Sequence, residues 1–266
     1  LQGYEKGFYI GGCLFDNVEK KIFYIVNCYH DEKINNFKLS MKKKVVVFSG
    51  AGISAESGLK TFRDENGLWE GHDVMEVASP MAWENNRELV LDFYNQRRRQ
   101  LLQVEPNAAH YALVELEKKY EVQIITQNVD DLHERAGSSN VLHLHGELLK
   151  ARSTFDENLV MDWRKDIRNG DFCEHNKQLR PHIVWFGEAV PMFEKAVDHC
   201  TTADILIIVG TSMQVYPAAG LVDFIPKKCP VYFVDPKPNI SENASLQIIS
   251  KKAVEGIPKV VAQLLA

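Results

Sequence analysis

The fold class of this chain is decided by the stretch Lys44-Val45-Val46-Val47-Phe48-Ser49-Gly50-Ala51-Gly52-Ile53-Ser54-Ala55. Its first part is a short apolar, β-branched run, the pattern of a parallel strand that is buried on both faces. The Gly-x-Gly-x-x-Ala spacing that follows is typical of a turn whose backbone approaches a pyrophosphate at the start of a helix. A tight strand-to-helix turn without a ligand also favours glycine, so both interpretations stay open for this stretch alone.

The rest of the chain repeats this alternation of strand and helix. Further strand-like runs are expected at 122–125, 141–144, 205–209 and 231–234, and apolar residues at helical spacing occur at 89–102, 109–116, 193–197 and 257–265. Strands that alternate with helices predict a parallel sheet with right-handed crossovers. We therefore expect an α/β fold, a doubly wound Rossmann-like parallel sheet.

Two segments interrupt the alternation and predict insertions. Residues 147–182 are polar, charged and poor in aliphatic side chains, which predicts a smaller inserted module. Residues 67–104 form a second insertion that is mostly helical. In an ordinary dinucleotide fold the second strand begins roughly 20 residues after the glycine turn, whereas here the next convincing strand begins near Val122. The nucleotide-binding half is therefore expected to contain a long excursion over the cofactor.

Residues 1–40 differ from the rest of the chain. They mix aromatic residues with Lys, Asn and Asp and show no sustained period, whereas Met41 directly precedes a lysine run and the first strong strand. We interpret 1–40 as an N-terminal extension of unknown role and 41–266 as the functional domain. A genuine accessory segment at 1–40 is the alternative.

Composition limits the classes of partner. The 266 residues are 45% hydrophobic and have a formal net charge of -5, which predicts no general attraction to nucleic acid or to an anionic membrane. No apolar run reaches the roughly 18–20 residues that a membrane span needs. The five cysteines are scattered and odd in number, which argues against a disulfide framework and favours a reducing compartment. We expect a cytoplasmic monomer without nucleic-acid or membrane partners.

Five blocks, in order, resemble the signatures of the sirtuin family, with approximately the family's spacing from residue 43 to the C-terminus. They are Gly50-Ala51-Gly52-Ile53-Ser54 with Ser57-Gly58 and Phe62-Arg63; Thr126-Gln127-Asn128-Val129-Asp130; His145-Gly146; Val184-Trp185-Phe186-Gly187-Glu188; and Gly210-Thr211-Ser212. The resemblance implies an NAD-dependent protein-lysine deacylase. Such an enzyme consumes NAD and releases nicotinamide and O-acyl-ADP-ribose.

The resemblance also implies which residues bind NAD. The glycine turn and Ser212 would hold the phosphates, and Asn128 and Asp130 would hold the nicotinamide carboxamide. Without the resemblance, an Asn/Asp turn and a capped turn explain these residues equally well. The full expected set is Gly50, Ala51, Gly52, Ser54, Phe62, Arg63, Gln127, Asn128, Asp130, Gly210, Thr211, Ser212 and Ala253.

Two histidines compete for the role of general base. An imidazole suits this role because its ordinary pKa lies near neutral pH. His143 and His145 are two residues apart, so strand alternation places both on one face and does not distinguish them. His145 stands beside Gly146 at the expected end of the strand and occupies the family's catalytic position. We therefore expect His145 to be catalytic and His143, like His133, to be structural.

A further group of residues predicts the substrate class. Tyr94 and Arg97 are three residues apart in a helical stretch, and they resemble the pair that binds the acyl carboxylate in the sirtuin subgroup with desuccinylase activity. Ala78 resembles the small residue that leaves room for the longer acyl chain. A solvated basic face formed by residues 97–99 is the alternative. Substrate contacts are also expected at Val184, Phe186, Gly187 and Glu188.

The chain departs from the usual family pattern in its cysteines. Most sirtuins hold a structural zinc with two Cys-x-x-Cys pairs in the small module, whereas this chain has only Cys173 there, with His175 two residues on. Four tetrahedral ligands are not available without help from Asp, Glu or His182. We expect no metal site, and a variant metal site is the alternative.

Three functions remain in competition at this stage. The first is the deacylase, acting on succinyl-, malonyl- and acetyl-lysine proteins. The second is an ADP-ribosyltransferase or NAD glycohydrolase that uses the same pocket, and the third is a sensor that binds ADP-ribose or NAD without catalysis. His145 argues against the sensor, since binding alone needs no base. The block 184–188 argues against the second, because it resembles a strand that pairs with a substrate peptide.

Overall fold

The computed structural model describes residues 42–60, 68–69, 71–238, 242 and 244–266. The chain divides into two compact units, Leu1–Lys42 and Lys43–Ala266, and the following description concerns the second. The role predicted for residues 1–40 therefore lies outside the described residues.

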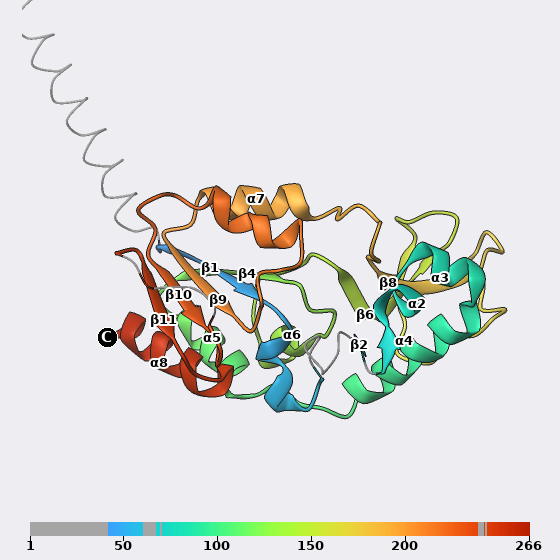
Figure 1. Cartoon of the computed structure of the whole chain (residues 1–266), viewed down its shortest axis with the longest axis horizontal. Coiled ribbons are helices and arrows are strands. Elements are labelled where there is room, and N and C mark those ends of the chain that lie inside the picture. Colours follow the sequence, from blue (N-terminus) through green and yellow to red (C-terminus); the bar gives the residue numbers. More distant parts are fainter. Residues whose placement is uncertain (1–41, 61–67, 70, 239–241, 243) are drawn as a thin grey trace, which may run out of the picture. The chain divides into compact units, whose positions relative to one another are not determined.

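The main sheet has six parallel strands in the order β11-β10-β9-β1-β4-β5 (Figure 1). The strands are β1 (Lys44–Ser49), β4 (Glu121–Thr126), β5 (Val141–His143), β9 (Ile205–Val209), β10 (Val231–Val234) and β11 (Leu246–Ile249). The strand-like runs predicted from the sequence all form strands here. β11 was not predicted. Because each neighbouring pair is parallel, the carboxyl ends of all six strands meet at one edge.

β1 lies inside the sheet, between β4 and β9, and its position determines where a ligand can bind. Val45, Val46 and Val47 are fully buried, as the apolar run predicts. From β1 the chain builds β4 and β5 on one side, and it later adds β9, β10 and β11 on the other. The strand order therefore reverses at β1. Open α/β sheets bind their ligands in the crevice beyond the strands at such a point.

Helices cover both faces of the main sheet, which confirms the doubly wound α/β class (Figure 1). On one face α5 (Ala108–Leu116) and α8 (Ala253–Leu265) share a core with Val45 and Val47. On the other face α7 (Phe193–Thr201) and the 3-10 segment η4 (Ala218–Phe224) share a core with Val46 and Phe48. The alternating sides of β1 are therefore buried by different helices.

A second core lies beside the main sheet, and we call the elements around it the small lobe. These elements are the antiparallel sheet β7-β6-β8, with β6 (Gly146–Ser153), β7 (Val160–Asp162) and β8 (Leu179–Ile183); the pair β2 (Leu68–Trp69) and β3 (His72–Asp73); and the helices α2 (Val74–Val77), α3 (Pro80–Asn85) and α4 (Arg87–Leu101). The segments 67–104 and 147–182 both contribute to it. Figure 1 shows α4 running along β6 and β8.

A buried arginine links α4 to the small sheet. Arg98 is fully buried, and it donates hydrogen bonds to the Leu148 carbonyl at 3.0 Å and to Asn95 Oδ1 at 2.7 Å. Asn95 Nδ2 in turn donates to the Ile167 carbonyl at 2.8 Å. Buried charged groups are tolerated when they are hydrogen-bonded in this way. The orientation of α4 against β6 is therefore set by specific polar contacts as well as by apolar packing.

Within the described part of the chain, no helix combines the length and apolar character needed to cross a membrane.

Candidate functional site

A cavity of about 470 Å³ is lined by residues from the carboxyl end of the main sheet and from the small lobe. It contains every described residue of the predicted sets: Gly50, Ala51, Gly52, Ser54, Gln127, Asn128, Asp130, Gly210, Thr211, Ser212 and Ala253 for the cofactor, His145 for catalysis, and Ala78, Tyr94, Arg97, Val184, Phe186, Gly187 and Glu188 for the substrate. The predicted contacts of Phe62 and Arg63 lie outside the described residues. The fold therefore brings together residues that are far apart in sequence.

The glycine turn packs directly against the turn after β9. The N–H of Gly52 donates to the Gly210 carbonyl at 2.8 Å, and Gly210 has a φ of +64°. A Cβ added to Gly52 would lie 2.6 Å from the Gly210 Cα, so a side chain does not fit there. Two glycines are thus needed for this close approach.

The conformation after the glycine turn differs from the prediction. The chain continues in two 3-10 turns, η1 (Ala51–Ile53) and η2 (Ala55–Ser57), where a helix start was expected. The N–H groups of Gly50 and Gly52 already donate to the carbonyls of Val209 and Gly210. These two glycines therefore shape the floor of the cavity by their lack of side chains, and their N–H groups are engaged within the protein.

Ser54, Asn128 and Asp130 form a buried polar group at the cavity wall. The Ser54 hydroxyl donates to Asp130 Oδ2 at 3.0 Å and accepts from Asn128 Nδ2 at 3.2 Å. The N–H of Leu132 donates to Asp130 Oδ1 at 3.2 Å, which is the local turn bond of the alternative interpretation. Burial raises the pKa of Asp130 to about 6, despite these hydrogen bonds. The cavity thus presents an amide and a carboxylate side by side.

His145 has the protonation state that a general base requires. Its Nδ1 lies 3.1 Å from the Gln127 carbonyl oxygen, which can only accept, so Nδ1 bears the proton and Nε2 is unprotonated. Burial lowers the pKa of His145 below its ordinary value, so the ring is neutral at neutral pH. Strand β5 ends two residues earlier, at His143, and His145 lies in the bend that follows.

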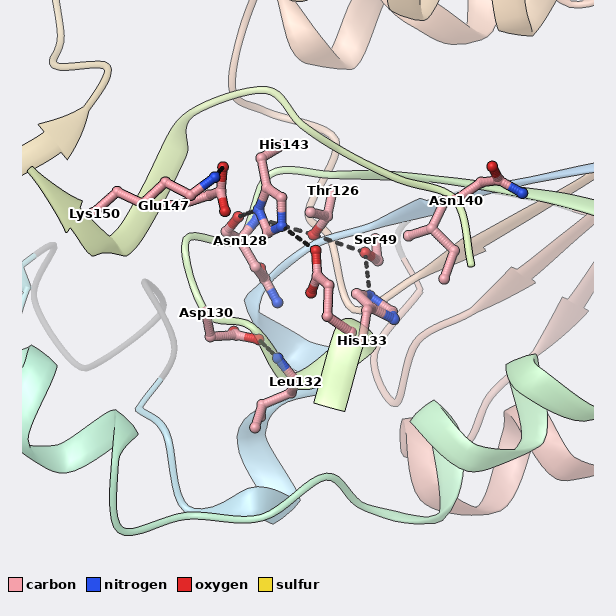
Figure 2. A network of polar contacts seen from close by, with 12 residues as sticks. Ser49, Thr126, Asn128, Asp130, Leu132, His133, Asn140, His143, Glu147 and Lys150 are labelled. Carbon is pink, nitrogen blue, oxygen red and sulfur yellow. Dashed lines mark hydrogen bonds and ion pairs between the residues drawn. The ribbon is translucent and has the colours of Figure 1, made fainter. Parts of the chain in front are cut away.

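His143 differs from His145 because both of its ring nitrogens are engaged. Nδ1 lies 2.9 Å from the Asn128 carbonyl oxygen (Figure 2). Nε2 lies 2.7 Å from Glu134 Oε1. Burial alone would lower the pKa of His143, but the hydrogen bond and the charge of Glu134 raise it. His143 therefore has the saturated contacts of a structural histidine, and it does not line the cavity.

A second buried network of hydrogen bonds holds the backbone of Asn128. Figure 2 shows Ser49 between Thr126 and His133: the Ser49 hydroxyl donates to Thr126 Oγ1 at 2.9 Å and lies 3.0 Å from His133 Nε2. The backbone N–H of Asn128 donates to the same Thr126 oxygen at 3.0 Å. The sequence indicated a structural role for His133 but did not reveal this network.

The three consecutive arginines of α4 have three different environments. Arg97 lines the cavity, and its guanidinium lies 4.7 Å from the Phe93 ring centroid. Arg98 is the buried anchor of α4. Arg99 forms an exposed ion pair with Asp166 at 2.7 Å. The alternative interpretation, a solvated basic face, therefore describes Arg99 and is wrong for Arg98.

Tyr94 lines the cavity together with Arg97, one helical turn away. Its side chain is fully buried, and its hydroxyl oxygen accepts a hydrogen bond from Trp185 Nε1 at 3.1 Å. Burial raises the pKa of Tyr94 well above its ordinary value, so the phenol is neutral. Ala78 is also buried, and its carbonyl accepts from the N–H of Phe186 at 3.0 Å.

The segment 184–188 follows β8, turns at Phe186 and Gly187, and lines the cavity, but the contacts of Glu188 differ from those expected of a substrate ligand. Its carboxylate accepts hydrogen bonds from Arg180 at 2.7 and 3.1 Å, from Arg152 at 3.2 Å and from the Trp185 N–H at 2.8 Å. The carboxylate is therefore saturated by the protein. Phe186, with 41% of its surface exposed, is the more accessible side chain of this segment.

Several cavity residues were not predicted from the sequence, among them Gln100, Tyr216, Asp235 and Lys252. Asp235 directly follows β10, so the rule that ligands bind beyond the carboxyl ends of strands, applied to this strand, identifies it. Tyr216 lies in a loop, and no comparable signal marks it.

Cys173 and His175, the residues considered for a variant metal site, lie in the segment 147–182. Cys173 is buried, with its Sγ 3.3 Å from Ser153 Oγ, and the His175 ring contacts the Phe155 ring. The described ranges contain no cluster of three or more His, Cys, Asp or Glu side chains suited to a metal ion.

We predict that the purified protein contains no stoichiometric zinc and keeps its fold and activity in a strong chelator, because Cys173 is engaged within the protein core. Elemental analysis and thermal unfolding with and without chelator measure this. One equivalent of tightly bound zinc, or a chelator-dependent fall in Tm, would contradict it.

Comparisons with known proteins identify the family. The Sir2 family profile matches residues 50–217, more than half of the chain. An NAD-dependent protein deacylase of Helicobacter pylori (strain ATCC 700392 / 26695) is 59% identical over 227 residues, which cover 84% of this chain and 98% of that protein. A protein of the same name from Bacteroides thetaiotaomicron is 48% identical over 230 residues, covering 84% and 98%.

Solved structures agree with the sequence comparisons. The crystal structure of a Sir2 homolog–NAD complex is similar to this chain with a TM-score of 0.75 and 36% sequence identity, and the match covers 84% of this chain and 90% of that one. The family profile covers most of the cavity-lining residues, and those at 234–236 and 252–253 lie beyond it. The chain therefore belongs to the Sir2 family.

Proposed function

We propose that this NAD-dependent protein deacylase removes the acidic acyl groups succinyl and malonyl, as well as acetyl, from lysines of its protein substrates. One observation supports this proposal above the others: a single cavity is lined by the neutral His145, by Asn128 and Asp130, and by Tyr94 with Arg97. The first three suit the chemistry on NAD, and the last two suit an acyl carboxylate.

The two glycine turns at the cavity suit the pyrophosphate of NAD. At the contact of the two turns, Gly52 and Gly210 have no room for a Cβ, so the two backbones approach closely beside the place proposed for the pyrophosphate. Ser212 and Ala253 line the same cavity. We propose that the hydroxyl of Ser212 contacts a phosphate, while Asn128 and Asp130 bind the carboxamide of nicotinamide with matching donor and acceptor atoms.

Bound NAD supplies the nicotinamide–ribose bond, which breaks as the acyl oxygen of the substrate attacks the ribose. The residues of this chain then have separate tasks. His145 Nε2 accepts the proton of a ribose hydroxyl, and its Nδ1–H stays on the Gln127 carbonyl, which keeps the ring oriented. The Asn128 amide is oriented by Ser54, and its backbone is held by Thr126.

Arg97 should determine the acyl preference. We expect succinyl-lysine to be removed at least as efficiently as acetyl-lysine, and we expect Arg97→Met to lower kcat/KM for desuccinylation by about 2 kcal/mol, or roughly 30-fold. The reason is the loss of a charged hydrogen bond to the acyl carboxylate. Products from NAD and a panel of succinyl-, malonyl- and acetyl-lysine peptides, identified by mass spectrometry, give the rates.

Arg99→Met is the matched control, because Arg99 lies on the same helix but pairs with Asp166 at the surface. It should change neither reaction. Equal losses of desuccinylation and deacetylation in Arg97→Met would show that Arg97 supports the fold and does not select the acyl group.

The same measurement distinguishes the alternative function. An ADP-ribosyltransferase or NAD glycohydrolase would yield ADP-ribosylated protein or free ADP-ribose, and a deacylase yields O-acyl-ADP-ribose. The segment 184–188 favours the deacylase, because it directly follows β8, lines the cavity and resembles the family's substrate-binding segment. The monomeric state and cytoplasmic location stay predictions.

A further inference from the structure

The hydroxyl group of Tyr94 is oriented by its contact with Trp185. Trp185 Nε1 donates to the Tyr94 oxygen at 3.1 Å, in a place where both side chains are buried. An indole N–H can only donate, so the phenol oxygen is the acceptor in this bond and the phenol O–H is itself a donor. A phenol proton lies near the plane of the ring and has two preferred positions. With one side taken by the indole, the proton occupies the other.

The Trp185 indole is itself held on several sides. The Arg180 guanidinium stacks on it, 3.3 Å from the ring centroid, and the Trp83 ring lies 5.7 Å away. The backbone N–H of Trp185 donates to Glu188 Oε2 at 2.8 Å. Only 2% of the Trp185 surface is exposed. The indole therefore has little freedom to move its N–H away from Tyr94.

Glu188 fixes this arrangement by pairing with two arginines. Its carboxylate binds Arg180 through two bonds and Arg152 through a third contact, and Arg180 Nη2 also donates to the Ile183 carbonyl at 3.0 Å. All of these groups are mostly buried, so the contacts are shielded from solvent. One carboxylate faces two guanidinium groups, which leaves one net positive charge in this cluster, and the charges of Arg180 and Glu188 both act on the Tyr94 phenol. Such a charge favours an anion in the cavity.

We propose that Trp185 is a positioning residue for acyl selection: it orients the Tyr94 hydroxyl toward the carboxylate of an acidic acyl group, and Arg180 and Glu188 hold the indole in place. This role rests on the acyl preference proposed above. It concerns residues outside the Tyr94–Arg97 pair, and it predicts that selectivity depends on a hydrogen-bond donor that does not touch the acyl carboxylate.

The test is Trp185→Phe, which keeps an aromatic ring under Arg180 but removes the N–H donor. We expect the ratio of desuccinylation to deacetylation, as kcat/KM, to fall about 5- to 10-fold, the scale of one hydrogen bond. The change should appear in KM for the succinyl peptide. Trp163→Phe is the matched control, because its Nε1 donates to the Asp166 carbonyl at 3.1 Å and it does not line the cavity. It should leave the ratio unchanged.

A double-mutant cycle shows whether Trp185 acts through Tyr94. If it does, the variant with both Trp185→Phe and Tyr94→Phe loses no more selectivity than Tyr94→Phe alone. Additive losses, or a Trp185→Phe variant that loses both activities in equal proportion, overturn this role. If Tyr94→Phe lowers the ratio of desuccinylation to deacetylation but Trp185→Phe leaves it unchanged, the role of Trp185 is overturned and that of Tyr94 stands. A wild-type chain that fails to remove succinyl overturns the proposed acyl class as well.

Discussion

Replacing His145 by alanine should lower NAD-dependent deacylation by about 10²–10⁴-fold, the usual loss when a general base is removed. The expectation follows from its proton arrangement: Nδ1 is bonded to the Gln127 carbonyl, burial keeps the ring neutral, and Nε2 is left as the basic atom. Turnover of an acyl-lysine peptide, measured with saturating NAD, gives the loss. A variant that retains more than about a tenth of wild-type turnover would rule out this role.

His143→Ala is the informative comparison, since the two histidines are two residues apart. Both ring nitrogens of His143 are engaged, by Asn128 and by Glu134, and the side chain lies outside the cavity lining. We expect this variant to lower Tm more than His145→Ala does, and to retain more activity at a temperature where both are folded. The opposite order would exchange the roles of the two residues.

Asp130→Asn should make the protein more stable and less active at neutral pH. The buried carboxyl group of Asp130 has a pKa of about 6 in the folded protein, whereas the ordinary value is 3.8. Between these values the folded form holds more protons than the unfolded chain, so the free energy of unfolding falls as the pH rises through the interval. At pH 7.5 the ionised group costs on the order of 2–3 kcal/mol, since one pKa unit is about 1.4 kcal/mol.

Denaturant unfolding of the wild-type and Asp130→Asn proteins between pH 4 and 8 measures this effect. The variant should lack the fall in stability between about pH 4 and 6, and at pH 7.5 it should exceed the wild type. Its kcat/KM for NAD should fall about 10- to 100-fold, because an amide in place of the carboxylate loses a charged acceptor for the carboxamide N–H. Parallel pH profiles of the two proteins would show that Asp130 is not the titrating group.

The main sheet was predictable because its strands are buried on both faces. A residue such as Val46 has no polar neighbour along β1, so the apolar run itself marks the strand. β11 was missed because it lies at the edge, pairs only with β10 and includes the exposed Gln247. β6 was missed for another reason. A register irregularity between Gly146 and Ala151 removes the regular alternation by which strands with one buried face are recognised.

Site residues that stand together in one block of sequence were predictable. Contacts between residues that are far apart in sequence and meet only in the folded chain were not. Asn128 and Asp130 lie in one turn, so the sequence shows them together. Tyr94 and Trp185 are 91 positions apart, and nothing in either segment indicates their hydrogen bond. The same holds for Glu188, which was expected to contact the substrate. Its saturation by Arg152 and Arg180 depends on how β6 and β8 pair.

The three adjacent arginines of α4 have a consequence for how such enzymes diversify. Arg97 faces the cavity, and its neighbour Arg98 joins the helix to β6. Because successive residues of a helix point about 100° apart, a substitution at Arg97 leaves the anchor at Arg98 in place. Under the acyl-selecting role proposed for Arg97, a single codon change at this position would alter the preferred acyl group while the scaffold persists. Adaptation to a new metabolic modification then requires little compensation elsewhere in the molecule.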